Sequence, residues 1–524
     1  MFLLVACLLV KVSDLSASAF LTHQANHLFA GAGTDLTTAT AAGPDGSAFF
    51  TGTFIGTISS SSGSISSNSG GLPDIFLTKL LPDGNTAWLL RLGGTSTEKA
   101  ECVATDPANG RVYVGGQFAG TASFGNTNLT AVAGNDGFVA CYEADGTFVW
   151  VRHIGGSGDE SVFDIKKAAD GLHLCGSYTA SGSWGATTFS STGGARWMFT
   201  VRADADGVPQ TGIYTSSTQS IQPKSMVVLT DGVRVIAGTF TGTLLLPGSI
   251  FRDSNGVDDF VAIAFESNGN MRWVITGGGT GNDGANSLVA SAAGDLLMGS
   301  SVEGGGQVTD VNGTQIISLA SAGMQVARVS TAGVYTPLKS VAGPQLAGLA
   351  EGKRGVLHVA ANFSAAVTLG TTTVNPPGNQ PSVFIASYLA AGDLAGVATL
   401  SGVGACSALD MAITSHDGIA LAGLAIGNLK YEEQTLATGN VGLDAFTLLL
   451  APPALRLGIA MQSAQVRLTY PAYFYDAAIW ENSTVASGSW TQIGSASTLT
   501  VGEMQQDPGA ADAMRFYQLR WLTP

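Results

Sequence analysis

Short runs of β-branched and aromatic residues alternate with glycine-containing turns along most of the chain. Within residues 101–154 the runs are ECVATD (101–106), RVYVGGQF (111–118), FVACYE (138–143) and FVWVRHI (148–154). Asn-Gly and Asp-Gly pairs lie in the turns, and such pairs supply the positive φ that tight hairpins require. No helical period of useful length intervenes. The pattern therefore predicts a four-stranded antiparallel meander.

The same meander recurs with a period of about 62 residues. Glycines at one strand position stand at 52, 116, 176, 238, 299 and 423, with Ala361 in the remaining place. Turn glycines at 46, 110, 171, 232, 294, 355 and 418 keep the same period, as does a third series at 84, 146, 207, 269, 333 and 392. Three series with one period predict seven copies. The fold class that we expect is all-β, a seven-bladed β-propeller of four-stranded antiparallel blades.

The two ends of the repeat region complement each other. The seventh copy ends with the run 444–450 and lacks a fourth strand, whereas residues 27–33, before the first copy, are similar to the endings of other copies. We expect this N-terminal strand to complete the last blade and close the ring, because closure removes an exposed strand edge. The propeller is then predicted to span residues 20–453.

The second copy carries three motifs that point to a known family. They are VATD at 103–106, GNDGFVA at 134–140 and DGTFVW at 145–150. These motifs resemble the SBBP-type repeats of exported bacterial seven-bladed β-propellers. Copies one and four match well, whereas copies five and six depart, with Ala361 in place of glycine. The resemblance implies the propeller fold and export but no particular activity, since most proteins of this family have none assigned.

The N-terminus carries a signal of a different kind. Residues 1–19 resemble a signal peptide, with the apolar run 1–10 and an A-x-A cleavage site at 17–19, although Lys11 follows that run instead of preceding it. A buried N-terminal strand is the alternative. The apolar run is too short for a membrane-spanning helix and no later segment qualifies, so we predict a mature chain without a transmembrane segment. Its expected location is secreted, periplasmic or at the cell surface.

The C-terminal residues 454–524 follow Pro452 and Pro453 and lose the repeat. Apolar residues alternate in runs such as 455–459 and 466–470, which predicts strands. The region resembles the small C-terminal β-sandwich of many exported bacterial proteins, and we predict a separate β-sandwich-like domain. A role in surface retention or secretion sorting and a role as a passive spacer both stay open.

Composition narrows the class of partner. With 45% hydrophobic and 12% charged residues the chain is not disordered, and its net charge of −15 repels phosphate backbones, so no nucleic-acid partner is expected. A protein or glycan partner and a monomeric state are predicted. The cysteines that would remain after cleavage are expected to be buried free thiols, with one adventitious bridge as the alternative; they are Cys102, Cys141, Cys175 and Cys406.

The sequence contains no catalytic constellation. It has no G-x-S-x-G motif, and its six histidines are scattered over different copies. We therefore predict no enzyme and no cofactor, and an exported scaffold that recognises protein or carbohydrate through its loops. The alternative is a polysaccharide-acting lyase or hydrolase built on the propeller.

Two sets of residues are candidate binding groups. Exposed aromatic residues favour carbohydrate binding, and Tyr178, Trp184 and Trp197 in the third copy are the best candidates, with packing between blades as the alternative. The second set consists of acids between the Gly-Gly ending of one copy and the inner strand of the next. Carboxylates that converge on the channel there could hold Ca²⁺, and solvated acids are the alternative; these acids are Asp35, Glu98, Glu160 and Asp283.

A further acid recurs two residues before a phenylalanine, at Asp74, Asp136, Asp258 and Asp444. We expect each of these side chains to accept a hydrogen bond from nearby backbone and so to shape a turn, while the phenylalanine packs between blades.

Overall fold

The computed structural model describes residues 21–452, apart from 32, 69, 70, 248, 249, 311, 320, 321, 440 and 441, together with six strands farther along the chain. The predicted signal peptide, residues 1–19, lies outside the described residues. One compact unit spans His23–Ala451, and a second contains the residues from Pro452 onwards. No helix in the described part of the chain is long and apolar enough to cross a membrane.

In the first unit, sheets of four main strands follow one another along the chain, each in the same order from an inner to an outer strand. The inner strands are β2 (Leu36–Ala42), β8 (Glu98–Thr105), β12 (Glu160–Ala168), β18 (Ser220–Val228), β24 (Gly284–Ala290), β30 (Gln345–Glu351) and β36 (Cys406–Ile413). The second strands are β3 (Ala48–Phe54), β9 (Val112–Ser123), β13 (Gly171–Tyr178), β19 (Arg234–Thr241), β25 (Leu296–Val302), β31 (Leu357–Phe363) and β37 (Ile419–Ile426).

The third strands are β6 (Asp74–Leu80), β10 (Asn128–Tyr142), β16 (Trp197–Ala203), β22 (Asp259–Phe265), β28 (Gly323–Val329), β34 (Ser382–Tyr388) and β40 (Leu443–Ala451). The outer strands are β7 (Thr86–Gly94), β11 (Phe148–Gly156), β17 (Pro209–Ser217), β23 (Met271–Gly278), β29 (Tyr335–Ala342) and β35 (Leu394–Ser401). In the sheet of β36, β37 and β40 the outer place is taken by the N-terminal strand β1 (Thr22–Phe29), which is hydrogen-bonded to β40.

Small hairpins lie in the connections between second and third strands. They are β4 (Thr57–Ser60) with β5 (Gly63–Ser66), β14 (Ser181–Trp184) with β15 (Thr187–Ser190), β20 (Thr243–Leu246) with β21 (Ile250–Asp253), β26 (Gly306–Thr309) with β27 (Gln315–Leu319), β32 (Val367–Leu369) with β33 (Thr372–Val374), and β38 (Leu429–Tyr431) with β39 (Gln434–Ala437). A short 3₁₀ turn, η1, covers Pro377–Asn379. Several of these hairpins pair with the outer strand of the preceding sheet, as β14 does with β11.

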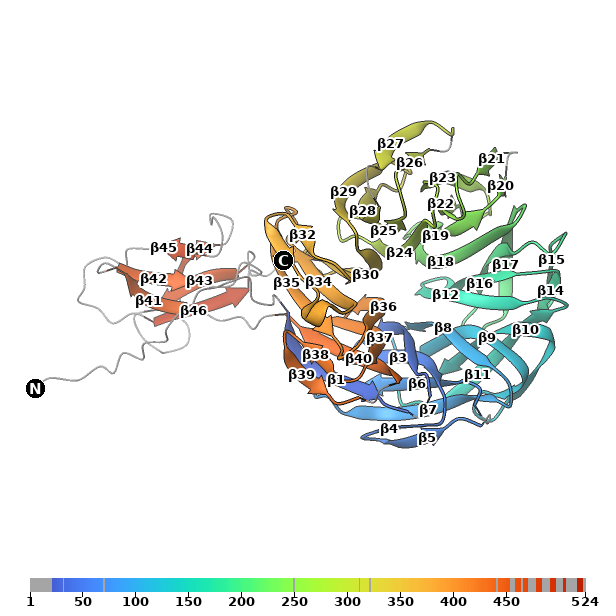
Figure 1. Ribbon diagram of the computed structural model, residues 1–524, viewed down its shortest axis with the longest axis horizontal. Helices are drawn as coiled ribbons and strands as arrows, with labels where there is room; N and C mark the ends of the chain where they lie inside the picture. The colour runs from blue at the N-terminus through green and yellow to red at the C-terminus, as the bar shows by residue number, and fades with distance from the viewer. Residues whose placement is uncertain are drawn as a thin grey trace, which may run out of the picture. The chain divides into compact units, whose positions relative to one another are not determined.

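The sheets stand around a common centre (Figure 1). Each inner strand contacts the inner strand of the next sheet, and β36 contacts β2. The core is divided into clusters between neighbouring sheets: Phe49 and Val114 belong to one such cluster, and Tyr113 and Leu174 to the next. This radial arrangement of antiparallel sheets is a β-propeller. The cysteines Cys102, Cys141, Cys175 and Cys406 are free and buried, which confirms that prediction.

The second unit contains two three-stranded sheets. One consists of β41 (Gly458–Gln462), β42 (Gln465–Thr469) and β45 (Glu503–Gln505), and the other of β43 (Ala477–Asn482), β44 (Thr491–Ser495) and β46 (Phe516–Trp521). Their pairings are antiparallel.

Strand β1 contributes to the core as well as to its sheet. Phe29 is 1% exposed and packs in a cluster with Phe54, Phe76 and Ala445. Its ring centroid lies 4.9 Å from that of Phe76. The N-terminal strand therefore joins the first and last repeats of the chain through apolar contact.

We expect the substitution Phe29→Ala to lower the free energy of unfolding by about 3–5 kcal/mol, because it opens a cavity in this cluster. Deletion of residues 20–34 is expected to do more, since it also exposes the edge of β40 and favours aggregation. Denaturant unfolding and light scattering measure both effects. The control is Val403→Ala, whose side chain is 65% exposed. A deletion variant that stayed monomeric with an unchanged melt would show that β1 does not hold these repeats together.

Candidate functional site

Every inner strand carries a β-bulge at the same place. There the register with the second strand shifts by one residue, and one residue of the inner strand has no partner. A bulge of this kind redirects a side chain. The unpaired residues, which we call the bulge residues, are Thr38, Glu101, Phe163, Lys224, Asn286, Ala347 and Leu409.

The glycines of the first sequence series lie across from the bulges. A Cβ on Gly52 would lie 1.8 Å from the carbonyl oxygen of Leu36, and one on Gly116 would lie 2.0 Å from that of Lys99. The missing side chain on the second strand permits this close approach. The glycine is a sequence signal for the bulge in five sheets, whereas Ser300 and Ala361 stand at this place in the fifth and sixth.

All the bulge residues line one central cavity of about 1380 Å³. Asn286, for example, is exposed to this cavity although the preceding residue, Ala285, is fully buried. No two bulge residues are of the same type: they supply a carboxylate, an ammonium, an amide, a hydroxyl, an aromatic ring and two aliphatic groups of different size. A repeated framework thus presents a set of different side chains to one space.

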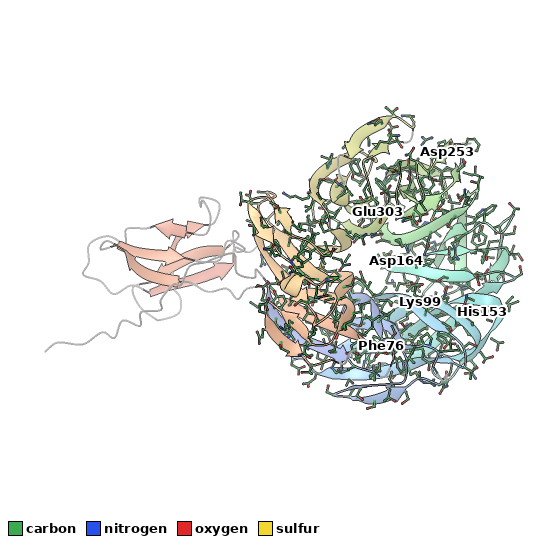
Figure 2. All side chains as sticks on the ribbon, in the orientation of Figure 1. Phe76, Lys99, His153, Asp164, Asp253 and Glu303 are labelled. Atoms are coloured by element: carbon green, nitrogen blue, oxygen red, sulfur yellow. The ribbon has the colours of Figure 1, made fainter. Side chains whose placement is uncertain are left out.

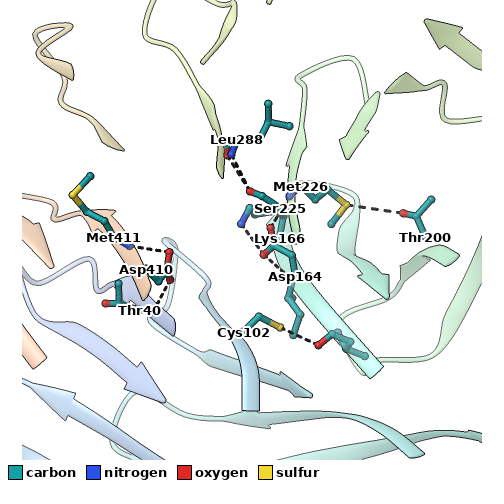
Figure 3. Close-up of polar contacts among 12 residues, drawn as sticks. Thr40, Cys102, Asp164, Lys166, Thr200, Ser225, Met226, Leu288, Asp410 and Met411 are labelled. Carbon is teal, nitrogen blue, oxygen red and sulfur yellow. Dashed lines mark hydrogen bonds and ion pairs between the residues drawn. The ribbon is translucent and has the colours of Figure 1, made fainter. Parts of the chain in front are cut away.

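Side chains next to the bulges tie adjacent inner strands together (Figure 3). Asp164 Oδ2 accepts a hydrogen bond of 2.7 Å from the Met226 amide, and Asp410 Oδ2 accepts one of 2.8 Å from the Thr40 amide. Ser225 Oγ accepts one of 3.1 Å from the Leu288 amide. Each of these acceptors directly follows a bulge residue, so the inter-strand bonds hold the bulges in place.

Lysine is concentrated in this cavity: Lys99, Lys166, Lys167 and Lys224 all line it, out of nine lysines in the chain. Lys99 Nζ lies 2.7 Å from Glu101 Oε1. Lys224 Nζ lies 5.6 Å from the centre of the Phe163 ring, and burial lowers the pKa of Lys224. Figure 2 shows Lys99 close to the central opening.

The carboxylates of the cavity are bound to the framework. Lys166 Nζ lies 2.8 Å from Asp164 Oδ1. Burial lowers the pKa of Lys166, but the attraction of Asp164 outweighs it, so that the pKa is raised overall. Burial raises the pKa of Asp410 to about 6, although the Thr40 and Met411 amides donate to its carboxylate and oppose the shift.

The structure brings two of the three candidate aromatic residues together. Tyr178 and Trp197 line a second cavity of about 670 Å³, which we call the aromatic pocket, and Trp184 does not line it. The expectation that these residues are exposed is wrong for Tyr178 and Trp184, which are 1% and 2% exposed, whereas Trp197 is partly exposed. The sequence could not separate these residues, because all three stand on or beside one hairpin.

The four acids proposed for Ca²⁺ do not converge on the channel, and that expectation is wrong. Asp35, Glu98, Glu160 and Asp283 are at most 1% exposed, and each lies between two sheets. The cause is their hydrogen bonding to the Gly-Gly ending of the preceding copy: the Gly94 amide donates to Glu98 Oε2 at 3.1 Å. Among the described residues no group of three or more His, Cys, Asp or Glu side chains is placed to hold a metal ion.

Each of these acids instead faces an acid of the preceding sheet. A Cβ on Gly93 would lie 2.7 Å from Asp74 Oδ1 and 2.9 Å from Glu98 Oε2, so these two carboxyl groups flank one glycine. Asp259 and Asp283 flank Gly278 in the same way, with both distances 2.6 Å. The other carboxyl pairs are Asp136 with Glu160 and Asp444 with Asp35.

The series of acids before phenylalanine needs one correction. In the fourth copy the acid of the pair is Asp259, because Asp259 is paired with Phe240 as Asp74 is with Phe54, whereas Asp258 precedes the strand. The predicted bonds to local backbone are confirmed for Asp74 and Asp136, and in the fourth copy Asp259, not Asp258, makes the corresponding bond. The acceptors are Asp74 Oδ2 from Asn68 at 2.8 Å, Asp136 Oδ2 from Val132 at 2.8 Å and Asp259 Oδ2 from Asn255 at 3.1 Å.

Burial and a neighbouring carboxyl raise the pKa of one acid in each of these pairs. Burial, together with the adjacent Asp74, raises the pKa of Glu98 to about 8, and burial with the charges of Asp136 and Asp159 raises that of Glu160 to about 8. In these two pairs the partner acid lies beside a basic side chain. Arg91 Nη1 lies 2.8 Å from Asp74 Oδ2, and His153 Nε2 lies 2.5 Å from Asp136 Oδ2. A cationic side chain such as Arg91 is unfavourable for a bound cation at the same place.

Neither a protein-family model nor a curated protein matches the chain. Among solved structures it is similar to one titled "Structure of Dos1 propeller", at 10% identity and a TM-score of 0.35 over 86% of this chain and 92% of that chain. It is also similar to a glucose dehydrogenase, at 12% identity and a TM-score of 0.30 over 63% and 95% of the two chains. A third is the exotype rhamnogalacturonan lyase YesX, at 12% identity and a TM-score of 0.24 over 90% and 83%. These similarities are too low to carry an argument about function.

We expect the stability of the propeller to fall as the pH rises from 5.5 to 9. Glu98 and Glu160 have higher pKa values in the folded chain than the ordinary value of 4.5. Their contribution to the free energy of unfolding is therefore fully present below pH 4.5 and is lost as the pH rises through about 8. Thermal melts across this range measure it. Glu98→Gln and Glu160→Gln, which keep a donor towards the partner acid, are expected to flatten the dependence. The exposed Glu433→Gln is the control; equal slopes in all variants would contradict the assignment.

Proposed function

We propose that the protein is an exported, non-enzymatic recognition scaffold, a seven-bladed propeller closed by β1, that binds a segment of a partner protein in its central cavity as a monomer. The observation that carries this proposal is the ring of bulge residues. Framework positions repeat from copy to copy, whereas the side chains directed into the cavity all differ. Such a surface is suited to one irregular ligand, because each sheet offers it a different group.

The size and chemistry of the cavity favour a peptide segment. Its volume of about 1380 Å³ exceeds the roughly 300–1,000 Å³ of small-molecule sites. One part offers Lys224, Glu101 and the ring of Phe163 to charged and aromatic side chains, and Ala347 and Leu409 offer apolar contact. The folded backbone beneath these side chains is held by inter-strand hydrogen bonds, which lowers the cost of ordering the site on binding.

The state of the carboxylates supports binding over catalysis. A polysaccharide lyase or hydrolase needs an acid or base that is free to exchange protons with its substrate. Asp164 and Asp410 accept backbone hydrogen bonds, and Glu101 is paired with Lys99. Ring closure is supported by the contact of β36 with β2 and by the bond from the Thr40 amide to Asp410. Export is supported by the resemblance of residues 1–19 to a signal peptide.

The test is selection of a phage-displayed random peptide library on the purified protein, followed by affinity measurement. We expect selected peptides to lose about tenfold or more in affinity to Phe163→Ala or Leu409→Ala, because these changes remove contact area from the cavity wall. Val334→Ala, outside the cavity and 61% exposed, is the control. Peptides that bind the cavity variants as well as the unmodified protein, or a failure to select any, would refute the site. Release of sugar from a polysaccharide would refute the non-enzymatic assignment.

A further inference from the structure

The third sheet departs from its neighbours at one cross-strand pair. At the end of the second strand, the first, second and fourth sheets pair a phenylalanine with a carboxylic acid: Phe54 with Asp74, Phe118 with Asp136, and Phe240 with Asp259. The third sheet pairs Tyr178 with Trp197 at this position. The next inner strand also lacks the partner acid, since Ile221 stands three residues before its bulge. Two aromatic side chains thus stand in the third sheet where its two neighbouring sheets have a phenylalanine and an acid.

These two residues form walls of the aromatic pocket together with Phe189 and Tyr214. The ring centroids of Tyr178 and Phe189 are 4.6 Å apart, and those of Tyr178 and Tyr214 are 6.1 Å apart. Trp197 and Tyr214 are partly exposed. Hydroxyl side chains surround the aromatic rings, from Ser157, Ser181, Ser183, Thr188 and Ser190. Among the described residues that line this pocket, none carries a charge.

One buried polar group of the pocket lacks a partner. The Tyr214 hydroxyl is buried and has no hydrogen-bond partner among the described residues. A Cβ on Gly182, which lines the pocket, would lie 2.3 Å from the ring of Phe189, so this ring packs directly against the glycine. An unsatisfied buried polar group is costly, and a ligand hydroxyl would satisfy it.

We propose that the aromatic pocket binds a neutral saccharide, with a sugar ring against Trp197 and Tyr214 and sugar hydroxyls bonded to the serine and threonine rim and to Tyr214. The C–H faces of sugar rings suit aromatic walls, and their hydroxyls act as both donors and acceptors for the hydroxyl rim. The uncharged lining gives an acidic sugar no cation to pair with. The volume of about 670 Å³ lies within the range of small-ligand sites.

This site is separate from the central cavity. The two sets of lining residues share no member, so the saccharide site does not rest on the peptide-binding function proposed above. A chain with both sites would bind a glycan on one sheet while it holds a protein segment at its centre.

The test is isothermal titration calorimetry of the full chain with cellohexaose, mannohexaose and maltohexaose. At least one of these neutral oligosaccharides is expected to bind. Trp197→Ala is expected to weaken binding by about tenfold or more, through loss of the stacked ring. Tyr214→Phe, which removes only a hydroxyl without a protein partner, is expected to weaken it by about two- to tenfold with no loss of thermal stability.

Two control variants separate the pocket from its surroundings. Trp184→Phe alters the same hairpin outside the pocket, and Phe163→Ala alters the central cavity; both are expected to keep the saccharide affinity. Absence of binding to all three probes overturns the proposal. So does unchanged affinity in both Trp197→Ala and Tyr214→Phe, or a loss in Trp184→Phe as large as that in Trp197→Ala. Saccharide binding by an unmodified protein for which no peptide can be selected would refute only the central site.

Discussion

The β-bulge that every inner strand forms against the second strand of its sheet is the constraint on which the rest of the propeller depends. In five sheets a glycine of the second strand lies opposite, and at Gly52, Gly116 and Gly423 a Cβ would lie within 2.2 Å of an inner-strand carbonyl oxygen. Ser300 and Ala361 take this place in the fifth and sixth sheets, where the bulge is kept. The bulge directs one side chain per inner strand into the cavity. In several sheets the next side chain bonds with the neighbouring strand, so the bulge positions both the candidate ligand-binding groups and the bonds that hold them.

The molecule separates positions that build the framework from positions that differ between copies. Glycines, alternating apolar residues and the carboxyl pairs recur because they make the same contacts in successive sheets. The bulge residues, which line the central cavity, differ from copy to copy, and so do Tyr178 and Trp197, which line the aromatic pocket. Comparison of the copies within this one chain therefore identifies candidate sites without any related sequence. At such a site the backbone keeps the geometry of the repeat, whereas the side chains differ from those of the other copies.

The repeat, its hairpins and the free cysteines could be predicted from the sequence, since they depend on local turn chemistry and on a period visible in the residues. The bulge residues could not, because they share no residue type. Both series of acids could be recognised in the sequence, but not that an acid of one series lies beside an acid of the other. The two acids of a pair belong to different sheets, and Asp444 and Asp35 are separated by almost the whole chain. Strand register determines that Asp259, and not Asp258, belongs to a carboxyl pair. The number of residues between an acid and the following phenylalanine does not determine this register. Likewise, only tertiary structure separates Trp197 from Trp184.

The carboxyl pairs also determine how the repeats can be rearranged. Each junction between sheets has either two acids or none: Asp74 meets Glu98, whereas Trp197 lies opposite Ile221 and Ser382 opposite Cys406. A copy carries one half of the junction on each side. Duplication of the third or the fourth copy would bury an acid against a tryptophan or an isoleucine, because each of them has an acid on one side only. The first and second copies have an acid on both sides, so their junctions stay compatible when either is duplicated. The order of the blades along the chain is therefore constrained by compatible junctions at some blades and not at others.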